Sequence, residues 1–564
     1  MRHATRLFTI LLIATMLVAG CSGIDDEVPA EHAADHEHPE AQSSSSAADV
    51  PLYDNLGEYH RAVATDVELA QAYFDQGLRL QYAFNHGEAI RSYREAVRLD
   101  PECAMCWWGI ALALGPNINA QMDSASGADA WSAITTARDL AAGGPAAEQA
   151  LIEALAQRFA ADPTAERPPL DSAYASAMRV VATSFPNDAD ALTLYGASLM
   201  NLSPWFYWTG DYGNREPRDD TPTMLASFEK ALALNPDHPG ACHYYIHSVE
   251  AAYPEKAVEC ADHLARLMPG AGHLVHMPGH IYIRVGRYAD AVRQNEHAVH
   301  ADETYIQDQR PGGLYPTAYY PHNYHFMWFA ATMAGMSDKA LYAAGQVAPK
   351  VPLEVAKQIY WIQNVLVLPQ LTMVTFGDWE GVLAEPMPPA DLHNASAMAH
   401  YSRGIAFAAT GRGAEARNEL EAVRQIANEI GATDTSEGPE IVVAIAGHAL
   451  AGEIALRTGD ADGAVRHLQA AARLEDGMLY DEPPVWYYPV RHSLGRALLE
   501  AGQPIEAEER YREDLVRFPA NGWSLIGLAN ALEAQGRRAE AEEVREEFRT
   551  AWSAADIQLT SSRI

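Results

Sequence analysis

The sequence HYYIHSVE at residues 243–250 is followed by a second histidine stretch, HLVHMPGH, at residues 273–280. Within each stretch the polar residues stand three, four or seven positions apart, so they would share one face of a helix. The stretches are in register, because His243 lies 33 residues before His276 and the next pair of histidines keeps that spacing. This period is typical of a solenoid of helix pairs, in which equivalent residues line one continuous surface.

A third histidine stretch, HNYH, follows at residues 322–325. The three stretches would together place seven histidines and one glutamate along a single groove. Imidazole and carboxylate groups that converge in this way are the ligands that a metal centre needs. The eight candidate metal ligands are His243, His247, Glu250, His273, His276, His280, His322 and His325.

The flanking sequence extends the helix-pair pattern. From about residue 66 to Pro101 the sequence alternates large and small residues over two helical segments, and Pro101 cannot continue the second helix. The small residues would let the two helices approach, and the large ones would fill the space between neighbouring pairs. This pattern resembles the tetratricopeptide repeat, a helix–turn–helix unit of about 34 residues. The residues that carry the resemblance here are Tyr73, Gly77, Leu80, Ala89, Tyr93, Ala96 and Pro101.

The same pattern recurs near the C-terminus, where Gly495, Tyr511 and Pro519 occupy corresponding places. The resemblance covers most of residues 66–550 and implies an all-α solenoid of about ten helix pairs. Two insertions, at residues 203–221 and 305–320, interrupt the spacing. Insertions in solenoids often lie on the binding face, so these would form a rim around the groove, or else loops that merely pack on the array.

The family register implies where the histidines point. In tetratricopeptide repeats, positions 2, 5, 9 and 12 of the first helix face the concave groove, and aligning Gly279 and Gly335 with the family pattern places all eight candidates there. Packed helices lie ~8–10 Å apart, so imidazoles on consecutive helices can meet at a metal–nitrogen distance of ~2 Å. Seven histidines exceed the needs of one ion. We therefore expect two ions, or one ion with further histidines that orient ligands or bind substrate.

The identity of the metal stays open, because copper, zinc and iron are all compatible with imidazole and carboxylate ligands. Glu250 is the candidate catalytic residue, as a ligand or a general base. Pro278 stands between His276 and His280 and should kink their helix. Two alternatives remain at this level: a metal-free polar groove that binds a ligand, and histidines that only pack.

Four cysteines form two further candidate pairs. Cys103 and Cys106 are spaced as CxxC, which in an exported protein indicates a disulfide, a redox pair or two soft metal ligands. Cys242 and Cys260 fall on the two helices of one repeat and are a second candidate disulfide. A separate segment, residues 480–492, is rich in proline and aromatic residues. It either breaks the helix or forms a far wall of the groove.

The N-terminal sequence predicts export. Residues 1–20 combine a basic start with a short apolar run, as in a signal peptide, and the residues before Cys21 resemble a bacterial lipobox with Cys21 as the lipidated residue. Residues 21–50 are rich in histidine, acid and serine and would form a disordered tether. We therefore expect a protein of the cell envelope that is held to a membrane through its N-terminal lipid only.

The chain has 564 residues and a formal net charge of −35, which excludes a nucleic-acid binder held by basic contacts to phosphates. We predict an exported lipoprotein with a tetratricopeptide-type solenoid over residues 51–556 and a tail at residues 557–564. Its first predicted function is that of a metal-dependent enzyme. The alternatives are a scaffold that binds a protein or peptide in its groove, and a metal carrier.

Overall fold

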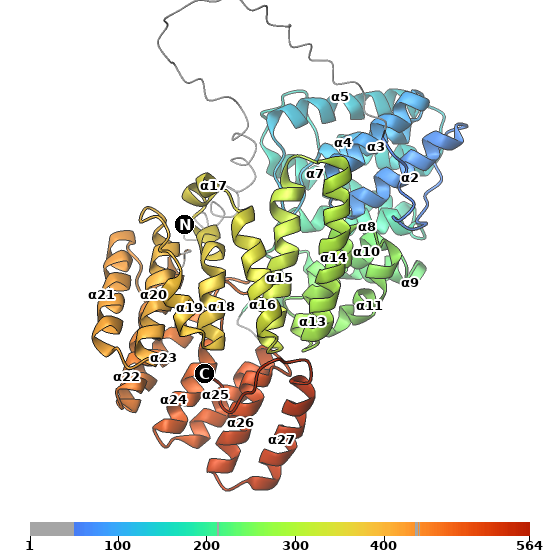
Figure 1. The fold of residues 1–564 in the computed structure, drawn as a ribbon. Coiled ribbons are helices and arrows are strands. Elements are labelled where there is room, and N and C mark those ends of the chain that lie inside the picture. Colours follow the sequence, from blue (N-terminus) through green and yellow to red (C-terminus); the bar gives the residue numbers. More distant parts are fainter. Residues whose placement is uncertain (1–49, 211–213, 435–437, 439) are drawn as a thin grey trace, which may run out of the picture. The chain divides into compact units, whose positions relative to one another are not determined.

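The computed structural model describes residues 50–210, 214–434, 438 and 440–564, and it confirms the predicted all-α solenoid fold. Contacts divide the chain into two compact units, Met1–Pro204 and Trp205–Ile564, and successive helices pack on one another within each unit (Figure 1). The predicted signal peptide, Cys21 and nearly all of the predicted tether lie outside the described residues. Within the described ranges, no helix has the length and apolar character needed to cross a bilayer.

The first unit begins with the helix pair that the sequence shows most plainly. The ring of Tyr93 fills the space beside two glycines: a Cβ at Gly77 would lie 2.6 Å from this ring, and one at Gly109 would lie 2.5 Å from it. Glycine at both places lets three consecutive helices approach one another. The helices of this unit are α2 (Glu68–Tyr82), α3 (His86–Leu99), α4 (Ala104–Leu114), α5 (Ser124–Leu140), α6 (Ala146–Ala156), α7 (Arg167–Ser184) and α8 (Ala189–Met200).

The second unit carries the histidine stretches in its first half. Its elements up to the middle of the chain are β1 (Trp208–Thr209), β2 (Glu216–Pro217), α9 (Thr221–Leu234), α10 (Pro239–Val249), η2 (Pro254–Ala257), α11 (Val258–Leu267), α12 (Gly272–His276), α13 (Pro278–Arg284), α14 (Tyr288–Gln309), η3 (Tyr315–Tyr319), α15 (Tyr320–Met333), α16 (Ser337–Val347) and η4 (Ala348–Lys350). The helix that would carry His273 to His280 is interrupted before Pro278, because α12 ends at His276 and α13 begins at Pro278, while Met277 between them keeps helical backbone angles.

The rest of the second unit continues the helix pairs. Here Tyr511 of α25 repeats the packing of Tyr93, since a Cβ at Gly495 or Gly527 would lie 2.3 Å from its ring. The elements are α17 (Leu353–Gln358), η5 (Tyr360–Val367), α18 (Leu368–Phe376), α19 (Trp379–Ala384), α20 (His393–Ala409), α21 (Gly413–Ile430), α22 (Ile441–Arg457), α23 (Ala461–Asp476), α24 (Val490–Glu500), α25 (Pro504–Arg517), α26 (Gly522–Ala534) and α27 (Arg538–Ala551).

Both predicted insertions contact the helices that carry histidines. In the first, β1 pairs with β2, and the indole of Trp208 donates a hydrogen bond to the backbone oxygen of Ser248 on α10 at 2.8 Å. In the second, the π-helical turn η3 leads directly into α15, and the Tyr319 ring centroid lies 4.8 Å from that of His273. Both insertions therefore border the histidine cluster.

Candidate metal centre

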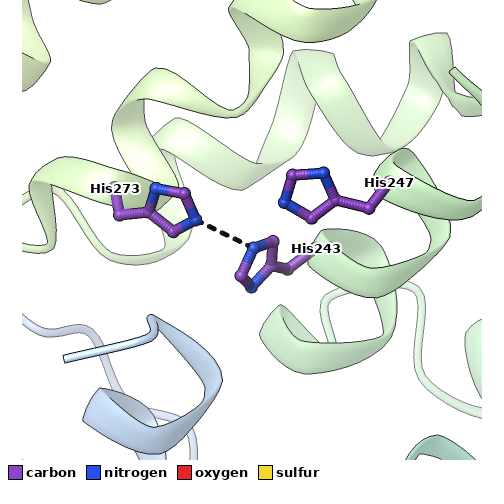
Figure 2. Close-up of side chains that lie close together, drawn as sticks. All are labelled: His243, His247 and His273. Atoms are coloured by element: carbon purple, nitrogen blue, oxygen red, sulfur yellow. Dashed lines mark hydrogen bonds between the residues drawn. The ribbon is translucent and has the colours of Figure 1, made fainter. Parts of the chain in front are cut away.

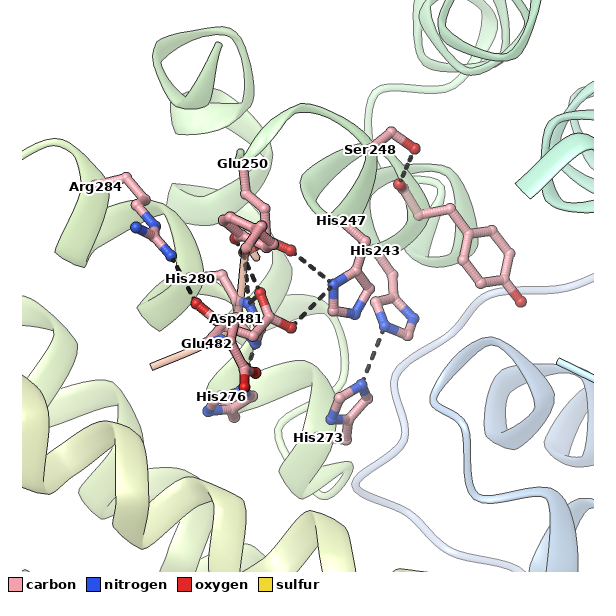
Figure 3. Close-up of polar contacts among 12 residues, drawn as sticks. His243, His247, Ser248, Glu250, His273, His276, His280, Arg284, Asp481 and Glu482 are labelled. Atoms are coloured by element: carbon pink, nitrogen blue, oxygen red, sulfur yellow. Dashed lines mark hydrogen bonds and ion pairs between the residues drawn. The ribbon is translucent and has the colours of Figure 1, made fainter. Parts of the chain in front are cut away.

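Four helices of the second unit bring the candidate residues together. His243 and His247 lie on α10 with Glu250 at its C-terminal end, His273 and His276 on α12, His280 on α13, and His322 on α15. A fifth contributor, Glu482, comes from the loop between α23 and α24 (Figure 3). All of these side chains are buried except His322 and Glu482, which are partly exposed.

The first group consists of His243, His247 and His273. Each residue offers one ring nitrogen, and these nitrogens lie within 4.8 Å of one another. The Nε2 atoms of His273 and His243 are 3.1 Å apart, and the ring of His247 lies close to both (Figure 2). A tetrahedral ion with metal–nitrogen bonds of ~2.0–2.1 Å holds neighbouring ligand nitrogens about 3.3 Å apart, so this spacing fits a bound metal.

The second group consists of His276, His280 and His322 and meets the same distance limit. The Nε2 atoms of His276 and His280 are 2.7 Å apart. The Nδ1 atom of His276 lies 2.7 Å from the amide oxygen of Asn295. That oxygen can only accept, since the amide nitrogen of Asn295 donates to the backbone oxygen of Ala291. His276 therefore carries its proton on Nδ1 and has a lone pair on Nε2.

His280 is oriented in the same way by carboxylates. Its Nδ1 atom lies 2.8 Å from an oxygen of Glu250 and 3.0 Å from an oxygen of Glu482, so Nδ1 donates and Nε2 faces His276 (Figure 3). If both imidazoles are neutral, two lone pairs meet at 2.7 Å, which is repulsive. The arrangement needs either a second proton on His280 or a cation between the two nitrogens.

The electrostatics of the cluster favour neutral imidazoles around one charged position. Burial, reinforced by His280, lowers the pKa of His247 to about 3 and that of His276 well below its usual range. Burial and neighbouring imidazoles also hold the pKa of His273 and His322 well below 6.5. Burial alone would lower the pKa of His280, but Glu482 and Glu250 raise it to about 10. The two carboxylates thus favour one positive charge at His280.

Glu250 links the two groups. One of its oxygens lies 3.0 Å from Nδ1 of His247, and the other lies 2.8 Å from Nδ1 of His280. Burial opposes ionisation of this carboxyl, but the interaction with His280 lowers its pKa overall. Glu250 is therefore placed to orient two imidazoles as an outer-shell carboxylate. An alternative set of ligand atoms also exists, because His247, Glu250, His280 and Glu482 form a third compact group.

Aromatic rings enclose the cluster. Trp205 meets His247 edge-on at a centroid distance of 5.1 Å, and Phe326 lies 4.6 Å from His276 and 4.4 Å from His280. Such walls exclude water and strengthen electrostatic interactions inside the site.

The structure separates the remaining candidates from this cluster. His325 stacks on Trp328, burial lowers its pKa to about 4, and it belongs to none of the three groups found among the described residues. Cys103 and Cys106 are joined in a disulfide, as are Cys242 and Cys260. Of the three interpretations of the CxxC motif, the structure therefore agrees with the disulfide and not with a pair of thiolate ligands.

Glu482 is the member that sequence reasoning missed. It lies within residues 480–492, the segment that was considered as a far wall of the groove. His492, at the end of that segment, would face the groove if the segment formed its far wall, but it pairs with the buried carboxylate of Asp514 at 2.8 Å. The acidic pair Asp481-Glu482 before two prolines was the available signal, but nothing local tied it to histidines about 200 residues away.

The tetratricopeptide repeat family model matches residues 397–422, 489–513 and 522–547. No curated protein matches the sequence significantly. Similar solved structures include the human IFIT1 dimer with m7Gppp-AAAA, at 14% identity over 87% of this chain and 91% of that one, with a TM-score of 0.31. Another is the APC/C hetero-tetramer Cut9-Hcn1, at 13% identity over 87% and 76%, with a TM-score of 0.29. Scores this low support no argument about function. The three matched segments, together with the helix pairs packed around glycine and tyrosine, show tetratricopeptide repeats in the C-terminal part of an all-α solenoid.

Proposed function

We propose that this protein holds two transition-metal ions side by side, one in each tri-histidine group. The first ion would be bound by His243, His247 and His273. The second would be bound by His276, His280 and His322. The groups are adjacent, since the ring centroids of His247 and His280 lie 5.0 Å apart. Glu250 would orient one ligand of each ion, His247 and His280, and Glu482 would also orient His280.

The meeting of two ε nitrogens at His276 and His280 carries this proposal. Their δ nitrogens are already engaged by Asn295 and by two carboxylates, so both ε nitrogens face the same point, where a metal ion would take the place of the second proton of His280. A metal-binding histidine characteristically donates its other ring N–H to a carbonyl or carboxylate, which fixes its orientation.

The ligand chemistry narrows the metal to copper, zinc or iron. Three imidazoles per ion suit a pair of copper ions, which would support oxidation or electron transfer, and zinc in the same place would support hydrolysis. The identity of the bound metal would therefore decide which reaction the protein catalyses. Glu250 remains the candidate catalytic base. The partly exposed His322 and Glu482 mark the side from which a substrate would reach the second ion.

Elemental analysis of the purified full-length protein tests the proposal. We expect two equivalents of metal in the parent, one in a His243→Ala/His273→Ala variant and one in a His276→Ala/His322→Ala variant. A His297→Ala/His300→Ala variant is the matched control, because it also removes two histidines but from the exposed face of α14. Its metal content should equal that of the parent. Fewer than one equivalent in a folded parent, even after reconstitution with each metal, would refute the proposal.

A second candidate function rests on the repeats themselves. Tetratricopeptide repeat proteins generally bind proteins or peptides, and three repeats in the C-terminal half match the family model. The two functions are distinguished by single His→Asn substitutions in the cluster. A scaffold would keep its partner affinity with modest losses, whereas a metal centre would lose its ion.

We further propose that the protein is anchored in the cell envelope through a lipid on Cys21. The apolar run and the lipobox-like residues before this cysteine support the proposal. Mass spectrometry of the mature N-terminus should find acyl chains on Cys21, and a Cys21→Ser variant should leave the membrane fraction. A parent protein that is recovered entirely without lipid would contradict it.

A further inference from the structure

The last residues of the chain lie among the C-terminal repeats in the manner of a bound peptide. After α27 the chain turns back, and its end reaches the region of α24 and α18 (Figure 1). Residues 553, 554, 556, 558 and 560 are exposed, whereas Leu559, Ser562 and Arg563 are buried. An exposed connection thus leads to a short segment with a few buried anchors, which we define as the tail segment, residues 559–564.

Side chains of the repeats hold the backbone of the tail segment. Asn530 of α26 donates to the oxygen of Thr560 at 2.9 Å, and Arg457 at the end of α22 donates to the oxygen of Ile564 at 3.2 Å. The hydroxyl of Tyr488 donates to the backbone oxygen of Ser562. Contacts of this kind do not depend on the side chains of the bound segment, so a separate peptide could make them equally well.

The hydroxyl of Ser562 occupies a defined polar position. It lies 2.7 Å from the hydroxyl of Tyr511 and donates to the backbone oxygen of His492 at 2.7 Å. Tyr511 is the ring that packs between Gly495 and Gly527, so its position is fixed by the repeats and not by the tail. A small hydroxyl residue is what fits here.

Arg563 enters an aromatic and acidic pocket. Its guanidinium carbon lies 4.9 Å from the centre of the Tyr488 ring, and the side chain is 4% exposed. The pocket is completed by Tyr401 and Tyr487, whose hydroxyls lie 2.9 Å apart. A buried carboxylate, Glu453, which accepts a hydrogen bond from Arg457 at 2.8 Å, adds a negative charge that favours the charged guanidinium of Arg563. Tyrosine faces combined with one carboxylate are the chemistry that recognises an arginine side chain.

We propose that the pocket formed by Tyr401, Glu453, Tyr487 and Tyr488 is a recognition site for an arginine-bearing peptide, which the tail segment occupies in cis. The preferred ligand is an extended segment in which a small hydroxyl residue precedes arginine, as Ser562 precedes Arg563. The site is separate from the histidine cluster and does not depend on metal. The short connection, which Asp556 ties to the start of α16, gives the tail an effective concentration of at least the order of millimolar, so an external peptide competes poorly until the tail is weakened.

The test uses the full-length chain and a fluorescent synthetic peptide of residues 557–564, with anisotropy as the readout. We expect an Arg563→Ala chain to bind this peptide at least about tenfold more tightly than the parent does, because its own tail no longer fills the pocket. A peptide with alanine in place of its arginine should not bind. Adding Glu453→Gln to the Arg563→Ala chain should weaken the binding again. A folded Arg563→Ala chain that fails to bind the peptide would overturn the proposal.

Hydrogen exchange of the unmodified protein gives a second measurement that needs no variant. A detachable tail should exchange the amides of residues 559–563 faster than those of α24 and α26, and an excess of the peptide should accelerate this exchange. If the tail and these two helices instead exchange together, and the peptide has no effect, the tail is an integral part of the repeat core and the proposal fails.

Discussion

At the scale of single residues, the candidate centre is defined by the ring nitrogens that are already engaged. His276 uses Nδ1 on Asn295, and His280 uses Nδ1 on Glu250 and Glu482. The orientation of each ring is therefore set before any ion binds. Outer partners of this kind also raise the basicity of the nitrogen that faces the metal, so their loss weakens binding without removing a ligand.

Replacing Glu482 with glutamine tests how much a carboxylate that contacts a ligand, but not the metal, contributes to metal affinity. The substitution keeps the shape of the side chain and removes its charge. We expect the metal affinity of the group His276, His280 and His322 to fall about 10- to 100-fold. The group His243, His247 and His273 should lose less affinity, because Glu482 lies 4.0 Å from Nδ1 of His247 but 3.0 Å from Nδ1 of His280. Competition with a chromophoric chelator measures the metal affinity of each group. An equal loss at the two groups would show that they are not separate sites.

Asp302 of α14 provides a pH-dependent prediction. Burial raises the pKa of its carboxyl to about 7, although hydrogen bonds from Tyr315 and Asn323, both at 2.7 Å, oppose the shift. In the unfolded chain the carboxyl ionises near its ordinary value of ~3.9. Between these values only the unfolded state has lost the proton, so the free energy of unfolding should fall as pH rises from about 4 to about 7, and then level off.

The Asp302→Asn variant should lack this decline, since its side chain resembles the neutral acid. At pH 8 we expect it to be more stable than the parent by on the order of 1 to 4 kcal/mol, as measured by chemical denaturation at several pH values. Asp308→Asn, an exposed position on the same helix, is the control and should leave the pH profile unchanged. A parent profile that is flat between pH 4 and 7 would contradict the assignment.

At the scale of helices, the repeats are positioned by a tyrosine between two glycines. A Cβ at Gly527 would lie 2.3 Å from the ring of Tyr511, which is itself buried and cannot move away freely. Gly345 lies inside α16 with nothing within 4 Å of the corresponding point. The same substitution therefore has opposite consequences at the two positions.

We predict that Gly527→Ala lowers the free energy of unfolding by about 1–3 kcal/mol through overpacking. The matched Gly345→Ala substitution should raise it by up to ~1 kcal/mol, because alanine is the better helix former. Thermal and denaturant unfolding measure both. If Gly527→Ala is as harmless as Gly345→Ala, the close approach of α26 to Tyr511 does not hold in solution.

The helix scale also shows what the sequence could predict. Helical periodicity determines which residues share a face, and the 33-residue spacing therefore placed the histidines of α10 and of α12 and α13 correctly toward one another. The position of a histidine in the repeat does not determine whether its ring meets another imidazole or an aromatic side chain. His325 is the example, because it was expected in the groove and stacks on Trp328. Glu482 is 202 residues from His280, and only the folded chain brings them together.

At the scale of the whole molecule, the contacts divide the chain at Pro204, and every candidate metal ligand belongs to the unit Trp205–Ile564. A metal in the cluster would connect α10, α12, α13, α15 and the loop that carries Glu482. The ion would stabilise this unit in proportion to its occupancy, because it binds the folded state and not the unfolded one. The unit Met1–Pro204 holds none of these ligands and gains nothing directly from the ion.

Removal of metal should therefore affect the two units differently. We expect treatment with a chelator to accelerate hydrogen exchange in α10, α12, α13 and α15, and to leave α2–α8 of the other unit unchanged, as measured by mass spectrometry of peptic fragments. The His297→Ala/His300→Ala variant should respond as the parent does, whereas a variant without the histidine ligands should already exchange quickly before the chelator is added. Faster exchange throughout both units would mean that the ion acts on the chain as a whole. No change anywhere would mean that the cluster keeps its structure without metal, since the protonated His280 and its carboxylates would then suffice to hold these helices together.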